Sequence, residues 1–184
     1  LNTAMDAVDK VRDTATSHQR CSIIEVMGRG AGYIAVDVAL ATGAEMVLVP
    51  EKDSAYSVDE IVDRIVVDIN KAQAVGKKHH IIISAEGIGH SFEIAKKIES
   101  LTGVETRATI LGHIQRGGSP SMRDRVIAAQ MGMKAIDLLK EGKSNRVVIV
   151  KDGKIDDVDI NEGLAMKKTI SDEDYKLIFK LSRS

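Results

Sequence analysis

A histidine and an arginine lie three residues apart in the segment "ILGHIQRGGSP", which covers residues 110–120. If this segment turns helically, His113 and Arg116 lie on one face, so both side chains can reach a single anion. Gly117 and Gly118 follow directly and allow the backbone to come close to a ligand. This combination of residues predicts a site that holds a phosphate group.

Two further loops carry residues of complementary chemistry. The segment "MGRGAGY", residues 27–33, follows an apolar run and offers glycine amides and Arg29 to an anion at the start of a helix. Glu86 ends another apolar run and precedes "GIGH". A carboxylate accepts hydrogen bonds from sugar hydroxyls, whereas arginine and histidine hold phosphate. The three loops together predict a site for a phosphorylated polyol.

The apolar runs that precede these loops predict a parallel β-sheet. Short runs rich in β-branched residues alternate with helical segments, and they cover residues 21–27, 45–50, 79–86, 104–111 and 146–151. Such alternation is typical of right-handed βαβ units. The predicted fold class is α/β, with three layers and a mostly parallel sheet that has helices on both faces. Ligands bind such sheets at the carboxyl ends of the strands, where the three loops are expected.

The segments between the runs have helical periodicity. In residues 57–72 the apolar side chains recur on one stripe, and Ser57 with Glu60 predicts a capping box. Residues 123–142 show the same pattern and end at a glycine. Near the end of the chain, "KDGK" predicts a turn, and "SDEDYKLIFKLS" predicts a capped helix that docks on the sheet or on the part of a longer polypeptide that precedes Leu1.

Composition and charge narrow the classes of function. The chain has 184 residues with 43% hydrophobic content, enough for one α/β domain, and its formal net charge is −1. Near-neutral charge with only 3% aromatic residues argues against nucleic-acid binding.

Cys21 lies within an apolar run, which predicts a buried, reduced thiol. Because no apolar stretch is long enough to span a membrane, a soluble, cytoplasmic protein is expected, and the start at Leu1 suggests a piece of a longer polypeptide.

The segment "MGRGAGY" also permits a dinucleotide-binding interpretation, because it follows a strand and opens a helix. It departs from G-x-G-x-x-G, since Tyr33 stands at the third glycine position. Glu45 or Glu51 would then be the acid that binds the ribose. One half of an NAD-dependent oxidoreductase therefore stays open as an alternative, and so does a free-standing, non-catalytic effector-binding module.

A second set of charges lies at the other ends of the predicted strands. Arg20 opens the first strand and Arg107 lies early in the fourth. At a rise of about 3.3 Å per residue, the backbones of Arg20 and Arg29 are roughly 25 Å apart. One small ligand within one subunit cannot bridge that distance, so Arg20 and Arg107 are either surface charges or part of a neighbouring subunit's site. The same edge gathers a third group, which contains Arg12, Glu45 and the "KKH" segment from Lys77.

Several motifs resemble those of one known family. The segments "TSHQR", "EVMGRGAGY", "AEG", "ETRATILGHIQRGGSP" and "DR" (Asp124 and Arg125) occur in the order and at close to the spacings of the carboxyl-terminal half of bacterial-type 6-phosphofructokinase. The resemblance covers nearly the whole chain and weakens after about Lys140. It implies that residues 1–184 form a carboxyl-terminal, sugar-phosphate-binding domain with a Rossmann-like fold, and that the amino-terminal ATP-binding domain is absent.

The resemblance also implies an activity for the longer protein. Members of this family transfer the γ-phosphoryl group of ATP, with magnesium, to the 1-hydroxyl of fructose 6-phosphate in glycolysis, and they are homotetramers. Their ATP loop and catalytic base belong to the amino-terminal half, so the present chain alone is expected to be inactive. The residues that distinguish ATP from pyrophosphate as donor belong to that half too, which leaves the donor open.

Individual residues take roles by the same resemblance. Arg29 would help to steady the transferring phosphoryl group, and Arg20 and Arg107 would reach into an adjacent subunit's site. The implied substrate-binding set is Arg20, Met27, Gly28, Arg29, Glu86, Arg107, His113 and Arg116. The implied effector site, for ADP or phosphoenolpyruvate, comprises Arg12, Gly43, Ala44, Glu45, Lys77, Lys78 and His79, with Glu45 near the effector's magnesium ion. Val75 stands where some members have a lysine directed toward the effector phosphate, which leaves the effector response open.

Overall fold

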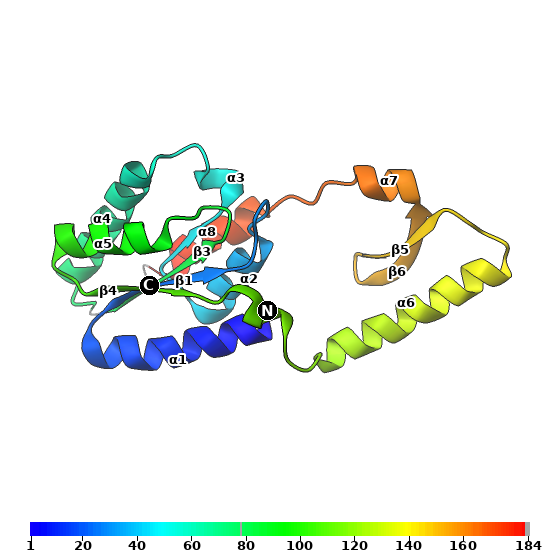
Figure 1. Ribbon diagram of the computed structural model, residues 1–184, viewed down its shortest axis with the longest axis horizontal. Coiled ribbons are helices and arrows are strands. Elements are labelled where there is room, and N and C mark those ends of the chain that lie inside the picture. Colours follow the sequence, from blue (N-terminus) through cyan, green and yellow to red (C-terminus); the bar gives the residue numbers. More distant parts are fainter. Residues whose placement is uncertain (78, 183–184) are drawn as a thin grey trace. The chain divides into compact units, whose positions relative to one another are not determined.

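The computed structural model describes residues 1–77 and 79–182, and these form two compact units (Figure 1). The sheet unit comprises Leu1–Gly117 together with the segment from Ile170 onward. The hairpin unit comprises Gly118–Thr169. None of the helices in the described ranges is long and apolar enough to cross a membrane.

The sheet unit is built on four strands, and every neighbouring pair is parallel. The strand order is β2-β3-β1-β4, with bounds Met46–Leu48 (β2), His80–Ala85 (β3), Cys21–Val26 (β1) and Thr106–Ile110 (β4). Both central strands, β1 and β3, are buried along their whole length. Strands buried on both faces need apolar side chains in nearly every position, which is why these segments read as continuous apolar runs.

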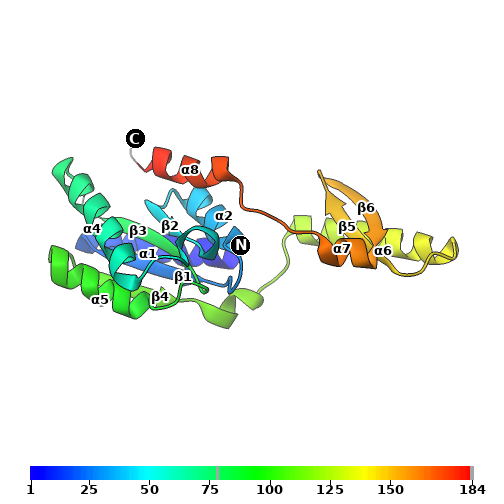
Figure 2. The same ribbon diagram turned by 90° about the horizontal axis from the view of Figure 1, so that it is seen from above.

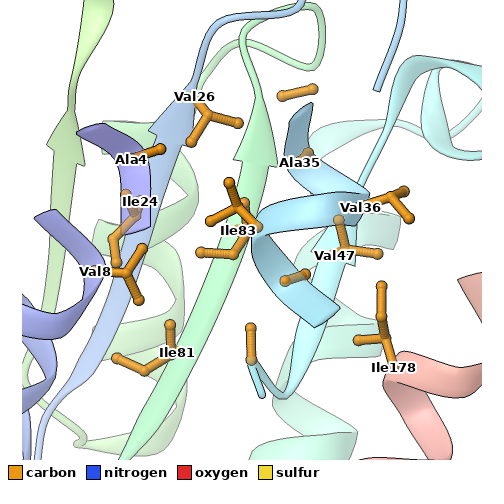
Figure 3. Close-up of a cluster of buried hydrophobic side chains, with 14 of the residues drawn as sticks. Ala4, Val8, Ile24, Val26, Ala35, Val36, Val47, Ile81, Ile83 and Ile178 are labelled. Carbon is orange, nitrogen blue, oxygen red and sulfur yellow. The ribbon is translucent and has the colours of Figure 1, made fainter. Parts of the chain in front are cut away.

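Helices cover both faces of this sheet. The first layer contains α1 (Asn2–His18), α2 (Tyr33–Thr42) and α8 (Asp172–Leu181), and its core is drawn in Figure 3. The second layer contains α4 (Val58–Ala74) and α5 (Ser91–Thr102), which lie side by side in Figures 1 and 2. The short helices α3 (Pro50–Asp53) and η1 (Gly112–Arg116) follow β2 and β4. The predicted α/β class, with a parallel sheet between helical layers, is confirmed.

Side chains of the central strands alternate between the two layers. Ile24, Ile81 and Ile83 belong to the core under α1 and α2, whereas Ile23 and Ile82 belong to the core under α4 and α5. Each fully buried isoleucine stabilises the fold by about 1.5–3 kcal/mol through removal of apolar surface from water. This double core holds the carboxyl ends of the strands, and therefore the loops that follow them, in a fixed arrangement.

Local signals in the sequence explain where the helices begin and end. Ser57 accepts the amide N–H of Glu60, whose carboxylate accepts the amide N–H of Ser57, so the predicted capping box is confirmed. The predicted apolar stripe of α4 faces the second core. Cys21 is buried as predicted, and burial raises the pKa of its thiol to about 12, so the thiol stays protonated at neutral pH.

The hairpin unit contains α6 (Met122–Lys140), β5 (Arg146–Lys151), β6 (Lys154–Asp159) and α7 (Ile160–Ala165). Residues 146–151 form a strand as predicted, but the prediction that this strand joins the parallel sheet is wrong. It pairs antiparallel with β6 in a separate two-stranded sheet. Asp152 and Gly153 have φ values of 50° and 75°, the conformation of a two-residue hairpin turn, which brings the chain straight back onto β5.

The chain then returns to the sheet unit through α8. The hydroxyl of Ser171 accepts the amide N–H of Asp174 and caps this helix, as the sequence predicts. Ile178 is buried in the first core, and Phe179 packs against the second. The prediction that the terminal helix docks on the sheet is therefore confirmed.

Candidate functional site

A hollow of about 230 Å³ opens at the carboxyl ends of β1, β3 and β4. It is lined by residues of the strand ends and of the loops that follow them: Glu25, Val26, Met27, Glu86, Ile110, Gly112 and His113. Three residues that the sequence analysis assigned to one site, Met27, Glu86 and His113, thus come together. The sheet explains this proximity, because parallel strands end at the same edge.

Backbone hydrogen bonds hold the loop after β1 against the loop after β3. The amide N–H of Glu86 donates to the carbonyl oxygen of Val26 at 2.8 Å, and that of Gly87 donates to Gly28 at 3.0 Å. Gly87 has no room for a side chain, because a Cβ there would overlap the carbonyl oxygen of Arg29. The close contact of these two loops places Arg29 beside Glu86.

The two charged side chains at this junction form a loose ion pair. Arg29 Nε lies 4.0 Å from Glu86 Oε1, and the side chains are 92% and 42% exposed. Such an exposed pair contributes little to stability. Both groups can therefore exchange this contact for contacts with a ligand: the guanidinium with a phosphate, the carboxylate with hydroxyls.

His113 and Arg116 lie on the short 3₁₀-helix η1, so this segment turns helically. Residues three apart are nearly eclipsed in a 3₁₀-helix, so the two side chains project on the same side. Both are exposed. Just before the turn, the amide N–H of Leu111 donates to the carbonyl oxygen of Glu25 at 3.0 Å, which attaches η1 to the end of β1.

Glu25 is a lining residue that the sequence analysis did not identify. It lies near the end of β1 and is only 9% exposed. Its Oε2 accepts a hydrogen bond from the hydroxyl of Ser91, the first residue of α5, at 2.5 Å. The signal that would have found it is a carboxylate in a strand whose positions are all buried.

The dinucleotide interpretation loses its support at the start of α2. The amide N–H of Gly32, which would face the phosphate of a dinucleotide, donates to both carboxylate oxygens of Glu51, at 3.0 and 3.1 Å. The chain thus supplies its own anion at this helix N-terminus. Glu45, the other candidate for a ribose-binding acid, lies before β2 at the opposite edge of the sheet.

Arg20 and Arg107 come together at that opposite edge. Arg20 Nε lies 2.6 Å from one oxygen of Glu105, and the Nη2 of Arg107 lies 2.6 Å from the other. The hydrogen bonds from Arg20 and Arg107 lower the pKa of the Glu105 carboxyl, so it stays ionised at neutral pH. The full length of β1 separates these arginines from the hollow, as predicted, so they do not share a ligand with His113 within one chain.

The predicted effector residues gather near the loop between α2 and β2. Arg12 donates to the carbonyl oxygen of Thr42, the last residue of α2, and Gly43 ends that helix with a φ of 62°. Ala44 is buried, and Glu45 Oε1 lies 2.8 Å from Lys77 Nζ. His79 is half-buried, whereas Lys78 lies outside the described residues.

A larger cavity of about 640 Å³ adjoins this group, and Glu45, Lys77, Val75 and His80 are among its lining residues. Burial lowers the pKa of His80, so its imidazole is neutral at pH 7. The Oε2 of Glu45 accepts the amide N–H of Ile81 at 2.5 Å, so both carboxylate oxygens have protein partners. Within residues 1–77 and 79–182, no group of three or more His, Cys, Asp or Glu side chains is arranged to hold a metal ion. The role of Glu45 toward the effector's magnesium ion stays a prediction.

Comparison with known proteins gives a consistent result. Residues 1–139 match the family model described as phosphofructokinase. The ATP-dependent 6-phosphofructokinase of Clostridium acetobutylicum is 51% identical over 183 residues, which is 100% of this chain and 56% of that protein. The enzyme of the same name from Clostridium botulinum is 48% identical with the same coverage. The chain thus spans about half the length of the curated relatives that it matches.

Solved structures agree with the sequence comparison. Phosphofructokinase from Saccharomyces cerevisiae superposes with a TM-score of 0.79 and 30% identity, covering 88% of this chain and 22% of that one. Phosphofructokinase from Pichia pastoris gives a TM-score of 0.76 and 32% identity, covering 86% of this chain and 19% of that one. The family match over most of the chain, together with these relatives, shows that the chain belongs to the phosphofructokinase family.

Proposed function

We propose that this chain is the sugar-phosphate-binding half of an ATP-dependent 6-phosphofructokinase. The complete enzyme transfers the γ-phosphoryl group of ATP to the 1-hydroxyl of fructose 6-phosphate, and it acts in the cytoplasm as a step of glycolysis. The observation that carries the proposal is the hollow at the carboxyl ends of the strands, which Glu86 and His113 line, with Arg29 beside Glu86. The names of the relatives that match the whole chain support the same activity.

Met27, Glu86 and His113, which line the hollow, and Gly28 and Arg116, which lie on the adjoining loop and turn, suit the two ends of the acceptor sugar. His113 and Arg116 project from one side of η1 and hold the 6-phosphate, because one turn presents two groups that can be cationic to one anion. Glu86 accepts hydrogen bonds from the sugar hydroxyls. Met27 and Gly28 bring the loop after β1 against the sugar.

Phosphoryl transfer depends mainly on positioning and on stabilisation of charge. Arg29, exposed at the rim, steadies the transferring phosphoryl group, and the remaining residues fix the acceptor in place. ATP, its magnesium ion and the aspartate that deprotonates the 1-hydroxyl belong to an amino-terminal domain outside this chain. The contribution of this half is therefore to bind and orient the acceptor.

Residues at the opposite edge of the sheet have two further functions in the complete enzyme. Arg20 and Arg107 complete the fructose 6-phosphate site of an adjacent subunit in a homotetramer, where a phosphate replaces Glu105 as their partner. Arg12, Lys77 and their neighbours Gly43, Ala44, Glu45, Lys78 and His79 bind ADP or phosphoenolpyruvate as an effector. Lys77, which lines a cavity of about 640 Å³, supports the effector role.

The hairpin unit supports the proposal that a further domain belongs to the protein. All residues of Gly118–Thr169 are described, and Leu138 is the one side chain among them that is buried. Large apolar side chains such as Met133, Leu139 and Leu164 are 60–80% exposed. Extended apolar exposure of this kind marks surfaces that contact other protein. In the complete enzyme, an amino-terminal ATP-binding domain would contact these apolar side chains.

The proposed activity is tested by joining this chain to the part of the Clostridium acetobutylicum protein that it does not match. The 184-residue chain alone is expected to form no fructose 1,6-bisphosphate from ATP and fructose 6-phosphate, whereas the chimera is expected to form it. A folded chimera without turnover would contradict the proposal. Turnover by the pure 184-residue chain would contradict the assignment of the base to the other half.

A further inference from the structure

Glu25 interrupts an apolar row on β1. Side chains alternate along a strand, so Cys21, Ile23 and Glu25 point to the same face of the sheet. Cys21 and Ile23 are fully buried in the core under α4 and α5, and Glu25 is 9% exposed. Burying a carboxylate is costly unless partners compensate for the lost water. An apolar residue at position 25 would continue the row without this loss of hydration. The carboxylate therefore indicates that Glu25 does more than fill the core.

The carboxylate of Glu25 can accept more hydrogen bonds than its contacts within the protein provide. The hydroxyl of Ser91 donates to Oε2 at 2.5 Å. Among the ion pairs of residues 1–77 and 79–182, none includes Glu25. An ionised carboxylate accepts about four hydrogen bonds through its two oxygens, and the bond from Ser91 uses one. The side chain is therefore held in place by Ser91 while it can still accept hydrogen bonds.

The position of Glu25 points to the kind of group that provides those bonds. Glu25 lines the same hollow as Glu86 and His113. Its neighbour on β3 in the sheet register is Ser84, whose Oγ is fully buried and has no hydrogen-bond partner among residues 1–77 and 79–182. Two carboxylates repel an anion but accept hydrogen bonds from neutral hydroxyls. This end of the hollow is therefore suited to the polyol part of a ligand and not to its phosphate.

We propose that Glu25 is a further sugar-binding residue, whose carboxylate accepts a hydrogen bond from a hydroxyl of the bound sugar beside Glu86. Ser91 acts as the positioning residue, because its hydroxyl holds the carboxylate from the start of α5. The inference rests on the proposed function, since it concerns the same hollow. It adds that selectivity for the sugar, as distinct from affinity for the phosphate, depends on a residue within the sheet itself.

The test compares two ligands on the 184-residue chain by calorimetry: fructose 6-phosphate, and ethyl phosphate, which has a phosphate but no hydroxyls. Glu25→Gln keeps the length of the side chain and one oxygen for Ser91, but replaces the other oxygen with a nitrogen that cannot accept. We expect this variant to bind fructose 6-phosphate about tenfold or more weaker, the usual loss for a hydrogen bond to a charged group, and ethyl phosphate unchanged.

Ser91→Ala is the matched control, because it removes the bond within the protein and keeps the carboxylate. It is expected to lower stability in urea and to change the ratio of the two affinities less than Glu25→Gln does. If Glu25→Gln weakens both ligands equally, or neither, Glu25 is a structural residue and the inference is wrong. If the unaltered chain does not bind fructose 6-phosphate, the claim that this half alone holds the acceptor fails and this inference fails with it, whereas the activity of the complete enzyme is decided by the chimera.

A second measurement does not depend on the folding of a variant. The carboxyl carbon of Glu25 in the unaltered chain is observed by ¹³C NMR during titration with each ligand. Fructose 6-phosphate is expected to shift this signal, and ethyl phosphate is not. A Glu25 signal that stays in place while His113 responds to fructose 6-phosphate would overturn the inference and leave the proposed function intact.

Discussion

Gly87 packs against the backbone carbonyl of Arg29 so closely that a Cβ at position 87 would overlap the carbonyl oxygen. This contact joins the loop after β3 to the loop after β1, together with the hydrogen bond from the Gly87 amide to Gly28. Arg29 and Glu86, which project from these loops, end 4.0 Å apart as a result. The arrangement of opposite charges at the site thus depends on a residue without a side chain.

Gly87→Ala is therefore expected to separate the two loops. The strain is expected to lower the free energy of unfolding by about 2 kcal/mol, which is typical of overpacking. Binding of fructose 6-phosphate is expected to weaken about tenfold, because Arg29 and Glu86 no longer converge. Gly30→Ala is the control in the same loop, since a Cβ there meets nothing within 4 Å. Equal affinities of the two variants in calorimetry would show that the loop contact does not position the site.

Arg116→Ala is expected to remove a contact to the non-reacting phosphate of the sugar. In the chimera, the KM for fructose 6-phosphate should rise about tenfold or more while kcat changes little, because uniform binding is lost. Lys140→Ala, an exposed cation on α6, should leave both parameters unchanged. An unchanged KM in the Arg116 variant would remove Arg116 from the substrate site.

The Asp53–Arg64 pair is expected to stabilise the sheet unit. Asp53 is fully buried, accepts the amide N–H of Val49 at 2.8 Å, and lies 2.8 Å from Arg64. Arg64→Ala leaves the buried carboxylate without its cation, and we expect a loss of about 3 kcal/mol in urea unfolding. Lys52→Ala breaks a more exposed pair with Asp172 and should cost at most about 1 kcal/mol. If Arg64→Ala and Lys52→Ala lowered the free energy of unfolding by similar amounts, the buried pair would not be more important for stability than the exposed one.

The hairpin unit is expected to lose stability in acid through Asp157. Lys134 and Arg146 lie 2.7 and 2.6 Å from its carboxylate and lower its pKa below the ordinary value of 3.8. Because the folded pKa is the lower one, this stabilisation is fully present above pH 3.8 and is lost as the pH falls through the folded pKa.

Amide exchange of α6 and β5, followed by NMR over this acidic range, measures the effect of Asp157. In Asp157→Asn, protection should be lower at neutral pH and should change less on acidification, because the asparagine does not titrate there. An unaltered acid response in this variant would assign the loss to other carboxylates.

The sequence predicts those features that depend on local pattern. The strands β1 and β3 are buried on both faces, so their apolar runs identify them, and the residues that follow parallel strands must meet at one edge. The partner of a strand is not a local property. Residues 146–151 have the same apolar character, yet the turn at Asp152 and Gly153 pairs them with the next strand.

Features that depend on the approach of distant segments were not predictable. Gly87 packs against the carbonyl oxygen of Arg29, and Glu51 accepts a hydrogen bond from the amide of Gly32. The residues adjacent to Gly87 and Glu51 in the sequence do not indicate these contacts. The apolar run around Glu25 predicts a buried strand, but it does not indicate that the Glu25 carboxylate lines a hollow. Such residues become visible only when the sheet register and the loop contacts are known.

The most direct test of the proposed acceptor site is an amide-shift NMR titration of the chain with fructose 6-phosphate, with fructose as the control without phosphate. The account predicts selective shifts at Arg29, Glu86 and residues 113–118 that fructose does not produce. Shifts that are absent from these residues, or that are the same for fructose, would contradict the claim that this chain holds the sugar phosphate at the carboxyl ends of its strands.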